Sequence, residues 1–211
     1  MKTLNLSYEL ENSTPAYGGE KNAFQKISTR SIKNGDNSNN SFLKLNNHIG
    51  THIDFPYHFS ENGKKSSDYN SDFWVANNVG FLECKLGEID KKIQYLNKNI
   101  EFLILKTGFY KYRNKERYWK DQPVIKANLA DIFKEKFPNL RFFGFDMISL
   151  TSKRDRQEGK IAHINFLINN KILIIEDMNL ENLTSAPSSI IISPLLVKDI
   201  DGAPCNIIAF L

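Results

Sequence analysis

Three of the four histidines in this 211-residue chain lie close together, in the stretch HIGTHIDFPYH at positions 48–58. The glycine and the proline of this stretch disfavour a helix, so we predict a strand that ends at the proline. Successive side chains of a strand point to opposite faces, which places His48, His52 and Asp54 on one face. After the proline the chain turns, and His58 is expected to return to the same side.

Two imidazoles and one carboxylate on a common face can hold a divalent metal ion and leave positions open for water or substrate. Solvated surface histidines, or histidines satisfied within the core, are the alternative interpretation. The convergence of most of the chain's histidines beside an aspartate favours the metal site. The opposite face carries Ile49, Ile53 and Phe55 and is expected to pack into the core, with Leu43 and Leu45 continuing it upstream.

The rest of the sequence predicts the elements that must position this face. Apolar residues spaced three to four apart, with Pro138 beyond them, predict a helix at 126–137. The Asn34-Gly35 pair predicts a hairpin or a long surface loop. We expect strands at 3–10, 101–106, 141–146, 171–175 and 189–197, and a second helix at 157–169. Strands that alternate with helices indicate an α/β or α+β fold.

Composition narrows the class of protein. Hydrophobic residues make up 41% and charged residues 25% of the chain, as in a globular protein and unlike a disordered chain or a coiled coil. No stretch approaches the roughly 18 apolar residues of a membrane helix, and the N-terminus lacks the apolar region of a signal peptide, so we expect a cytoplasmic protein. The net charge of +4 forms no basic stripe, and we expect no nucleic-acid partner. Cys84 and Cys205 are expected to be buried thiols.

The pattern His-x-Gly-Thr-His-x-Asp-x-Pro-x-His resembles the signature of the cyclase-like, metal-dependent hydrolase family, which includes bacterial kynurenine formamidases and isatin hydrolases. The resemblance implies a single α/β domain over residues 1–211 with the cyclase-like (swivelling β/β/α) fold, a mixed sheet or half-barrel with flanking helices. It also implies a homodimer or homotetramer. Shorter similarities follow in the family's order at Asn5-Leu6-Ser7, Thr107-Gly108, Gly144-Phe145-Asp146 with Ser149, 162–176 and Asp201-Gly202-Ala203-Pro204.

The resemblance also implies a role for each site residue. His48, His52 and Asp54 match the family's first metal ligands. The distal ligands of members that hold two ions are matched by His163 and Glu176. One or two Zn²⁺ or Mn²⁺ ions per chain are therefore implied, and His58 matches the catalytic histidine that moves protons.

The distal half departs from the family pattern at two places. The interval from His163 to Glu176 is one residue longer, and we assign the extra residue to the Asn169-Asn170 turn. Lys171 stands where a glycine is expected before the following strand.

The predicted function is hydrolysis of a small amide, formamide or lactam by a metal-activated water, with His58 accepting and returning the proton. By resemblance, N-formyl-L-kynurenine is the single best substrate prediction. Tyr8 and Asn206 replace a histidine and an arginine of many members, and we expect these changes to affect substrate choice. An apolar wall for an aryl substrate and ordinary core packing are both open for the aromatic residues Tyr57, Phe59, Phe73 and Trp74.

Two other functions are open. A non-catalytic member of the fold would bind a metal or ligand without turnover, but it has no need of His58. A non-haem iron oxygenase with His52, Asp54 and His163 as ligands is the second alternative, and it leaves His48 and His58 unexplained.

Three acidic residues outside the motif have more than one interpretation. Glu176 ends an apolar run, where an unpaired buried carboxylate is costly, so a metal ligand is favoured there. Asp177 is the alternative carboxylate for the pocket. Asp146 ends a predicted strand, and a structural cap is favoured over a role in orienting a ligand histidine.

Overall fold

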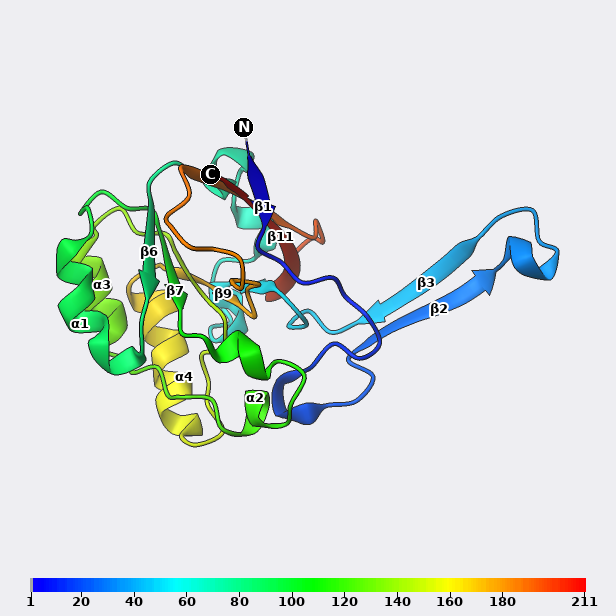
Figure 1. The fold of residues 1–211 in the computed structure, drawn as a ribbon, viewed down its shortest axis with the longest axis horizontal. Helices are drawn as coiled ribbons and strands as arrows, with labels where there is room; N and C mark the ends of the chain where they lie inside the picture. Colours follow the sequence, from blue (N-terminus) through cyan, green and yellow to red (C-terminus); the bar gives the residue numbers. More distant parts are fainter. Residues whose placement is uncertain (1) are drawn as a thin grey trace.

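A mixed sheet runs through the centre of the computed structural model, which describes residues 2–211 (Figure 1). One half of the sheet is parallel and contains β6 (Val79–Glu83), β7 (Phe102–Lys106), β8 (Phe142–Phe145) and β9 (Leu173–Glu176). The other half is antiparallel and continues from β9 through β4 (His52–Asp54), β11 (Gly202–Phe210) and β10 (Ser189–Pro194) to β5 (Val75–Ala76). The short strand β1 (Thr3–Asn5) also pairs with β11. The predicted α/β class with a mixed sheet is confirmed.

Helices flank the parallel half of the sheet. Figure 1 shows α1 (Ile89–Lys92), α3 (Leu129–Lys136) and α4 (Arg156–Ile164) beside β6 and β7, with α2 (Arg117–Lys120) below them. Parallel strands that helices cover are buried on both faces, and every residue of β7 is buried. Short 3₁₀ turns connect the elements: η1 (Tyr17–Gly19), η2 (Ile32–Asn34), η3 (Pro56–His58), η4 (Ser66–Asp68), η5 (Ser71–Trp74), η6 (Leu86–Glu88), η7 (Ile93–Tyr95) and η8 (Phe109–Tyr112).

A two-stranded hairpin extends away from the body of the molecule (Figure 1). It is made of β2 (Phe24–Arg30) and β3 (Asn40–Leu45), and we call residues 24–45 the arm. Near its tip Gly35 adopts φ 94°, in the left-handed region that glycine tolerates. The hairpin predicted from Asn34-Gly35 is therefore confirmed.

The continuous strand predicted from Leu43 into the histidine motif is wrong. The strand β3 belongs to the arm, where the Leu43 side chain is 51% exposed instead of facing the core. Residues 47–51 then form bends, and strand geometry returns only at β4. The physical reason lies at Gly50, which adopts φ 62° and where a Cβ atom would overlap the Leu10 side chain. His48 therefore lies in a bend and not in a strand.

The other predicted elements are present with shorter bounds. The strands at 101–106, 141–146, 171–175 and 189–197 correspond to β7, β8, β9 and β10, and the helix at 126–137 corresponds to α3. The strand predicted at 3–10 ends at Asn5. Three strands, β5, β6 and β11, lie where none was predicted. Cys84 and Cys205 are buried free thiols, as expected.

The helix predicted at 157–169 corresponds to α4 and a π-helical turn, η9 (Asn165–Asn169), that follows it. In a π turn each backbone hydrogen bond spans one residue more than in an α-helix. The turn therefore accommodates the extra residue of this interval, next to the predicted Asn169-Asn170 turn. Lys171 then adopts φ 56°, a left-handed conformation that favours glycine. Among residues 2–211 no helix has the length and apolar character needed to cross a membrane.

Candidate metal centre

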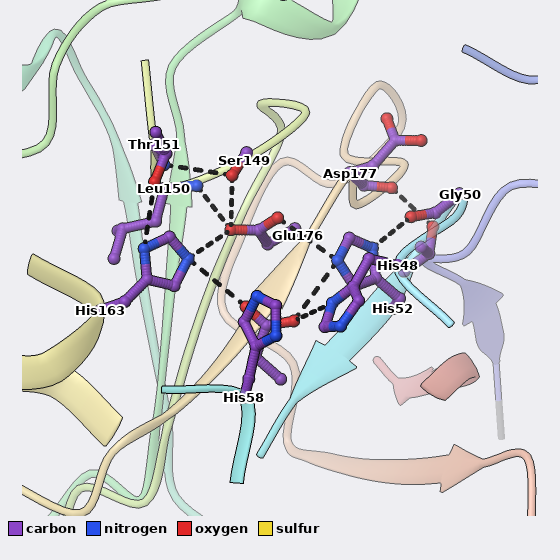
Figure 2. A network of polar contacts seen from close by, with 12 residues as sticks. His48, Gly50, His52, His58, Ser149, Leu150, Thr151, His163, Glu176 and Asp177 are labelled. Atoms are coloured by element: carbon purple, nitrogen blue, oxygen red, sulfur yellow. Dashed lines mark hydrogen bonds and ion pairs between the residues drawn. The ribbon is translucent and has the colours of Figure 1, made fainter. Parts of the chain in front are cut away.

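Four buried side chains from three elements meet at the junction of the parallel and antiparallel halves of the sheet (Figure 2). His52 and Asp54 lie on β4, Glu176 ends β9, and His163 lies on α4. Antiparallel pairing places His52 directly opposite Glu176. We call these four residues the inner cluster; each is at most 3% exposed.

The distances within the inner cluster leave room for a cation between the side chains. Nε2 of His52 is 3.3 Å from Oε2 of Glu176 and 3.5 Å from Oδ1 of Asp54. Nε2 of His163 is 3.5 Å from an oxygen of each of the same two carboxylates. Two carboxylates and two imidazole nitrogens facing a common space are a donor set typical of divalent metals.

The tautomers of the two buried imidazoles follow from their other nitrogens. Nδ1 of His52 lies 2.8 Å from the Gly50 carbonyl, and Nδ1 of His163 lies 2.8 Å from the Gly159 carbonyl. A carbonyl only accepts, so each Nδ1 carries the proton and each Nε2 presents a lone pair in the neutral ring. Nε2 of His52 is buried without a hydrogen-bond partner. In the neutral rings these lone pairs face carboxylates, so each Nε2 needs a proton or a metal ion beside it, and the inner cluster therefore fits a metal ion.

Both carboxylates of the inner cluster are held in the ionised form. Burial raises the pKa of Asp54, but the positive charge of His48 and the ion pair with His163 outweigh it and hold the pKa well below the usual range. Burial and the charge of Asp54 raise the pKa of Glu176, but the ion pairs with His163 and His52 lower it overall. Glu176 also accepts the backbone N–H of Leu150. Two ionised carboxylates thus share one buried space.

A second, more exposed group adjoins the inner cluster through Asp54. Nδ1 of His48 is 2.8 Å from Oδ1 of Asp54, and the His58 ring lies 4.1 Å from the His48 ring. The His48 and His58 side chains are 26% and 30% exposed, so this group opens toward solvent. Ligand atoms of His48, Asp54 and His58 lie within 4.8 Å of one another, as do those of His52, Asp54 and Glu176. Two neighbouring cation positions that share Asp54 are thus compatible with the geometry.

The four imidazoles differ in their electrostatics. Burial lowers the pKa of His48, but the charge of Asp54 and hydrogen bonds to Asp201 and Asp54 raise it to about 10. Burial also opposes protonation of His163, but its contacts with Asp54 and Glu176 raise its pKa to about 9. The pKa of His52 is raised for the same kind of reason, by Glu176 and Asp54.

His58 is the exception among the four histidines. Burial lowers its pKa, and the positive charges of His48 and His163 lower it further, against the opposing charge of Asp54. A lowered histidine pKa leaves the ring neutral near pH 7. His58 is therefore the imidazole of the site that can accept a proton.

Local features of the sequence explain how the motif reaches this geometry. Thr51 donates its hydroxyl to the Asp177 carbonyl and accepts the Tyr8 N–H, which ties the bend to the end of β9 and to the N-terminal segment. Gly202 leaves space for the His48 ring, which a Cβ atom there would overlap. These contacts fix the bend between the arm and β4.

The sequence does not single out Asp201 as a site residue. Its Oδ2 lies 2.9 Å from Nε2 of His48 and 3.2 Å from Nδ1 of His58. The sequence signal is the family-like stretch Asp201-Gly202-Ala203-Pro204, which carries no assigned role, and its Asp-Gly pair is equally typical of a turn.

The two other acidic residues take structural roles. Asp177 is buried and faces away from the inner cluster, with its carboxylate accepting hydrogen bonds from Arg113 and the Tyr118 hydroxyl. Asp146 accepts the Thr107 and Gly108 N–H groups at the end of β7. Glu176, and not Asp177, is therefore the carboxylate that faces the histidines. Asp146 caps a turn, which is the role that the sequence favours.

The aromatic residues after the motif separate into two groups. The Phe59 ring stacks on His163 with ring centroids 4.6 Å apart, so it borders the site. Phe73 and Trp74 pack against Phe142 in the core. Of these three aromatic residues, Phe59 is the one placed to form an apolar wall beside the histidines.

Comparison with known protein families identifies the class of protein to which this fold and site belong. The family model described as "Putative cyclase" matches residues 4–151, which is more than half of the chain. The chain therefore belongs to the cyclase family.

Individual relatives match nearly the whole chain. A kynurenine formamidase of Bacillus thuringiensis subsp. konkukian is 28% identical over 209 residues, which covers 97% of this chain and 96% of the relative. Among solved structures, an isatin hydrolase bound to the product analogue thioisatinate superposes with a TM-score of 0.81 at 16% identity, over 100% of this chain and 92% of the other. A potential metal-dependent hydrolase with cyclase activity superposes with a TM-score of 0.75 at 20% identity, over 99% and 96%. At these identities the two structures establish the shared fold.

Proposed function

We propose that this chain is a metal-dependent hydrolase that cleaves the C–N bond of a small amide, formamide or lactam. The observation that carries the proposal is the pair of buried Nε2 atoms of His52 and His163, each 3.3–3.5 Å from the two ionised carboxylates, where a metal ion can replace the proton between them. His52, Asp54, His163 and Glu176 would hold one ion, and His48 with Asp54 would hold a second. We propose zinc or manganese, because imidazole and carboxylate donors suit both.

His58 is proposed as the proton carrier. When bound, the cation supplies Lewis acidity that lowers the pKa of water and polarises a carbonyl oxygen. The neutral His58 ring lies at the solvent-facing side of the group, where it can take up the proton of the attacking water and return it to the leaving nitrogen. A cation-binding module without turnover has no use for a neutral imidazole at this position.

We propose an aryl amide as substrate, with N-formyl-L-kynurenine first and isatin second. The Bacillus relatives are kynurenine formamidases, and one structural neighbour is an isatin hydrolase. The Phe59 ring beside His163 supports an aryl group, because aromatic rings stack favourably on one another.

The test compares the wild-type protein with His58→Ala after loading with zinc or manganese. The variant is expected to keep its metal and to lose about 10²–10⁴-fold in kcat. Tyr57→Ala is the matched control, since the Tyr57 ring packs beneath the Lys65 ammonium group. A wild-type rate in His58→Ala would refute the role of His58. Absence of turnover on formamides, amides and lactams by the metal-loaded wild type would refute the hydrolase.

A homodimer or homotetramer in the cytoplasm belongs to the same proposal, with the arm as the contact between copies. An isolated two-stranded hairpin is marginally stable in water, and Ile27 and Phe42 form a cross-strand pair that is 46% and 58% exposed. A second copy that covers this pair would remove the exposed apolar area. Phe42→Ser is expected to lower the mass measured by light scattering, while the neighbouring Lys44→Ser leaves it unchanged. A monomeric wild type would contradict the assembly.

A further inference from the structure

The carboxylate of Asp201 lies between the two more exposed imidazoles of the site. Its Oδ2 is 2.9 Å from Nε2 of His48 and 3.2 Å from Nδ1 of His58. Its Oδ1 accepts the side-chain amide of Asn47 at 2.7 Å. A carboxylate that is ionised only accepts hydrogen bonds, so both imidazoles must present an N–H to it.

The backbone fixes Asp201 to the histidine motif. The Asp201 carbonyl accepts the Phe55 N–H at 2.9 Å, and the next residue, Gly202, pairs with Asp54 across β11 and β4. The carboxylate is therefore held in register with the strand that carries the inner cluster. The sheet sets the position of its backbone, and Asn47 holds its carboxylate.

These contacts determine which nitrogen of each ring is free. His58 donates from Nδ1 to Asp201, which leaves Nε2 as the atom with the lone pair. His48 donates from Nε2 to the same carboxylate, which leaves Nδ1 directed at Asp54, 2.8 Å away. A carboxylate that binds one nitrogen of an imidazole fixes the tautomer and orientation of the other nitrogen.

We propose that Asp201 is a positioning residue that fixes the tautomer of His58 and the orientation of the His48 ring together. For His58 it selects Nε2 as the proton-accepting atom, and for His48 it selects Nδ1 as the atom that faces Asp54 and a bound cation. Its negative charge also stabilises the imidazolium that forms when His58 takes up a proton. The effect on catalysis rests on the proposed function, whereas the tautomer of His58 does not depend on it.

The direct test reads the tautomer of the His58 imidazole by NMR. In uniformly ¹⁵N-labelled protein at mildly alkaline pH, correlation of ring nitrogens with ring protons distinguishes an Nδ1–H from an Nε2–H imidazole. The four histidines are assigned with single His→Gln variants. The wild type is expected to show His58 as the Nδ1–H tautomer, and Asp201→Ala is expected to lose this preference. The matched control is Asp199→Ala. Asp199 lies two residues before Asp201, and its side chain contacts Ser67.

Two results of the NMR experiment would overturn the proposal. One is an Nε2–H tautomer of His58 in the wild type, and the other is an unchanged Nδ1–H tautomer in Asp201→Ala. Neither NMR result depends on whether the protein catalyses a reaction. A wild type that hydrolyses nothing would refute the proposed function, while the tautomers would still decide the role of Asp201.

The kinetic test applies to the metal-loaded enzyme. Asp201→Asn is expected to lower kcat by about 10–100-fold with KM changed less than about twofold and with metal content equal to that of the wild type. Asp201→Glu is expected to recover part of the loss, and Asp199→Asn to behave as the wild type. An unchanged kcat in Asp201→Asn, or a loss that disappears when metal occupancy is restored, would overturn the effect on His58.

Discussion

Metal uptake by the metal-free protein is expected to release at least about two protons per chain. The pKa of His48 is raised to about 10 and that of His163 to about 9. Near pH 7.5 both rings are therefore more than about 95% protonated. A cation that takes a lone pair from each ring must displace both protons. His58 contributes none, because its pKa is lowered and the ring is already neutral.

The sign of the pH dependence follows from the same values. Protons compete with the cation wherever His48 and His163 are charged, so the affinity for metal falls as the pH is lowered from about 9 toward 6.5. Asp54 and Glu176 release no protons in this pH range, since their pKa values are lowered and both are already ionised.

Isothermal titration calorimetry measures the number of protons directly. Zinc is titrated into metal-free protein in two buffers of different ionisation enthalpy, and the difference in apparent enthalpy gives the protons released. His163→Gln should release about one proton fewer, while His58→Gln, its matched control, should release as many as the wild type. A release near one in the wild type would mean that His48 keeps its proton and is not a ligand. A release near zero would refute the electrostatic description of the site.

Three further substitutions test the local physical arguments. Lys171→Gly should raise stability by about 1 kcal/mol, or about 2–4 °C in Tm, because Lys171 adopts φ 56°; an unchanged Tm would contradict strain at this position. Gly202→Ala should lower metal affinity by about 10–100-fold, measured by chelator competition, because the added Cβ overlaps the His48 ring, and wild-type affinity would show that the ring tolerates displacement. Asp177→Asn should cost about 3–5 kcal/mol in denaturant unfolding, since it leaves the largely buried Arg113 without its ion pair; the exposed Glu116→Gln is the control and should leave stability unchanged.

The sequence predicts the meeting of His48, His52 and Asp54, and the structure brings these side chains together. The contact between His48 and Asp54 nevertheless has a different structural cause from the predicted one. Strand alternation places His52 and Asp54 on β4, but His48 reaches Asp54 from a bend that Gly50 makes possible with φ 62°. Local periodicity identifies an element well, whereas the left-handed glycine that interrupts it depends on the neighbouring Leu10 side chain.

The distal residues show what family resemblance adds to periodicity. A helix and a strand are predicted on either side of Asn169-Asn170, and they place His163 and Glu176 next to β4 as the resemblance implies. The extra residue of this interval coincides with a π turn and with the left-handed Lys171. Both ends of the interval are held by tertiary packing, so the added residue is taken up locally.

Asp201 could not be found from the sequence. Its contact with His58 joins residues 143 positions apart, and it depends on β11 lying against β4. No strand was predicted at β11, so neither this pairing nor the position of the carboxylate followed from local patterns. Contacts that depend on the order of strands in a sheet need the fold itself.

The most direct test of the metal centre is elemental analysis of protein purified without an affinity histidine tag. We expect one or two equivalents of zinc or manganese per chain, and two equivalents would support separate positions for the inner cluster and for His48 with Asp54. Asp54→Ala should lose the metal, because Asp54 contacts both groups. A protein that contains no metal and takes up none on titration would contradict the central claim that these histidines and carboxylates hold a catalytic ion.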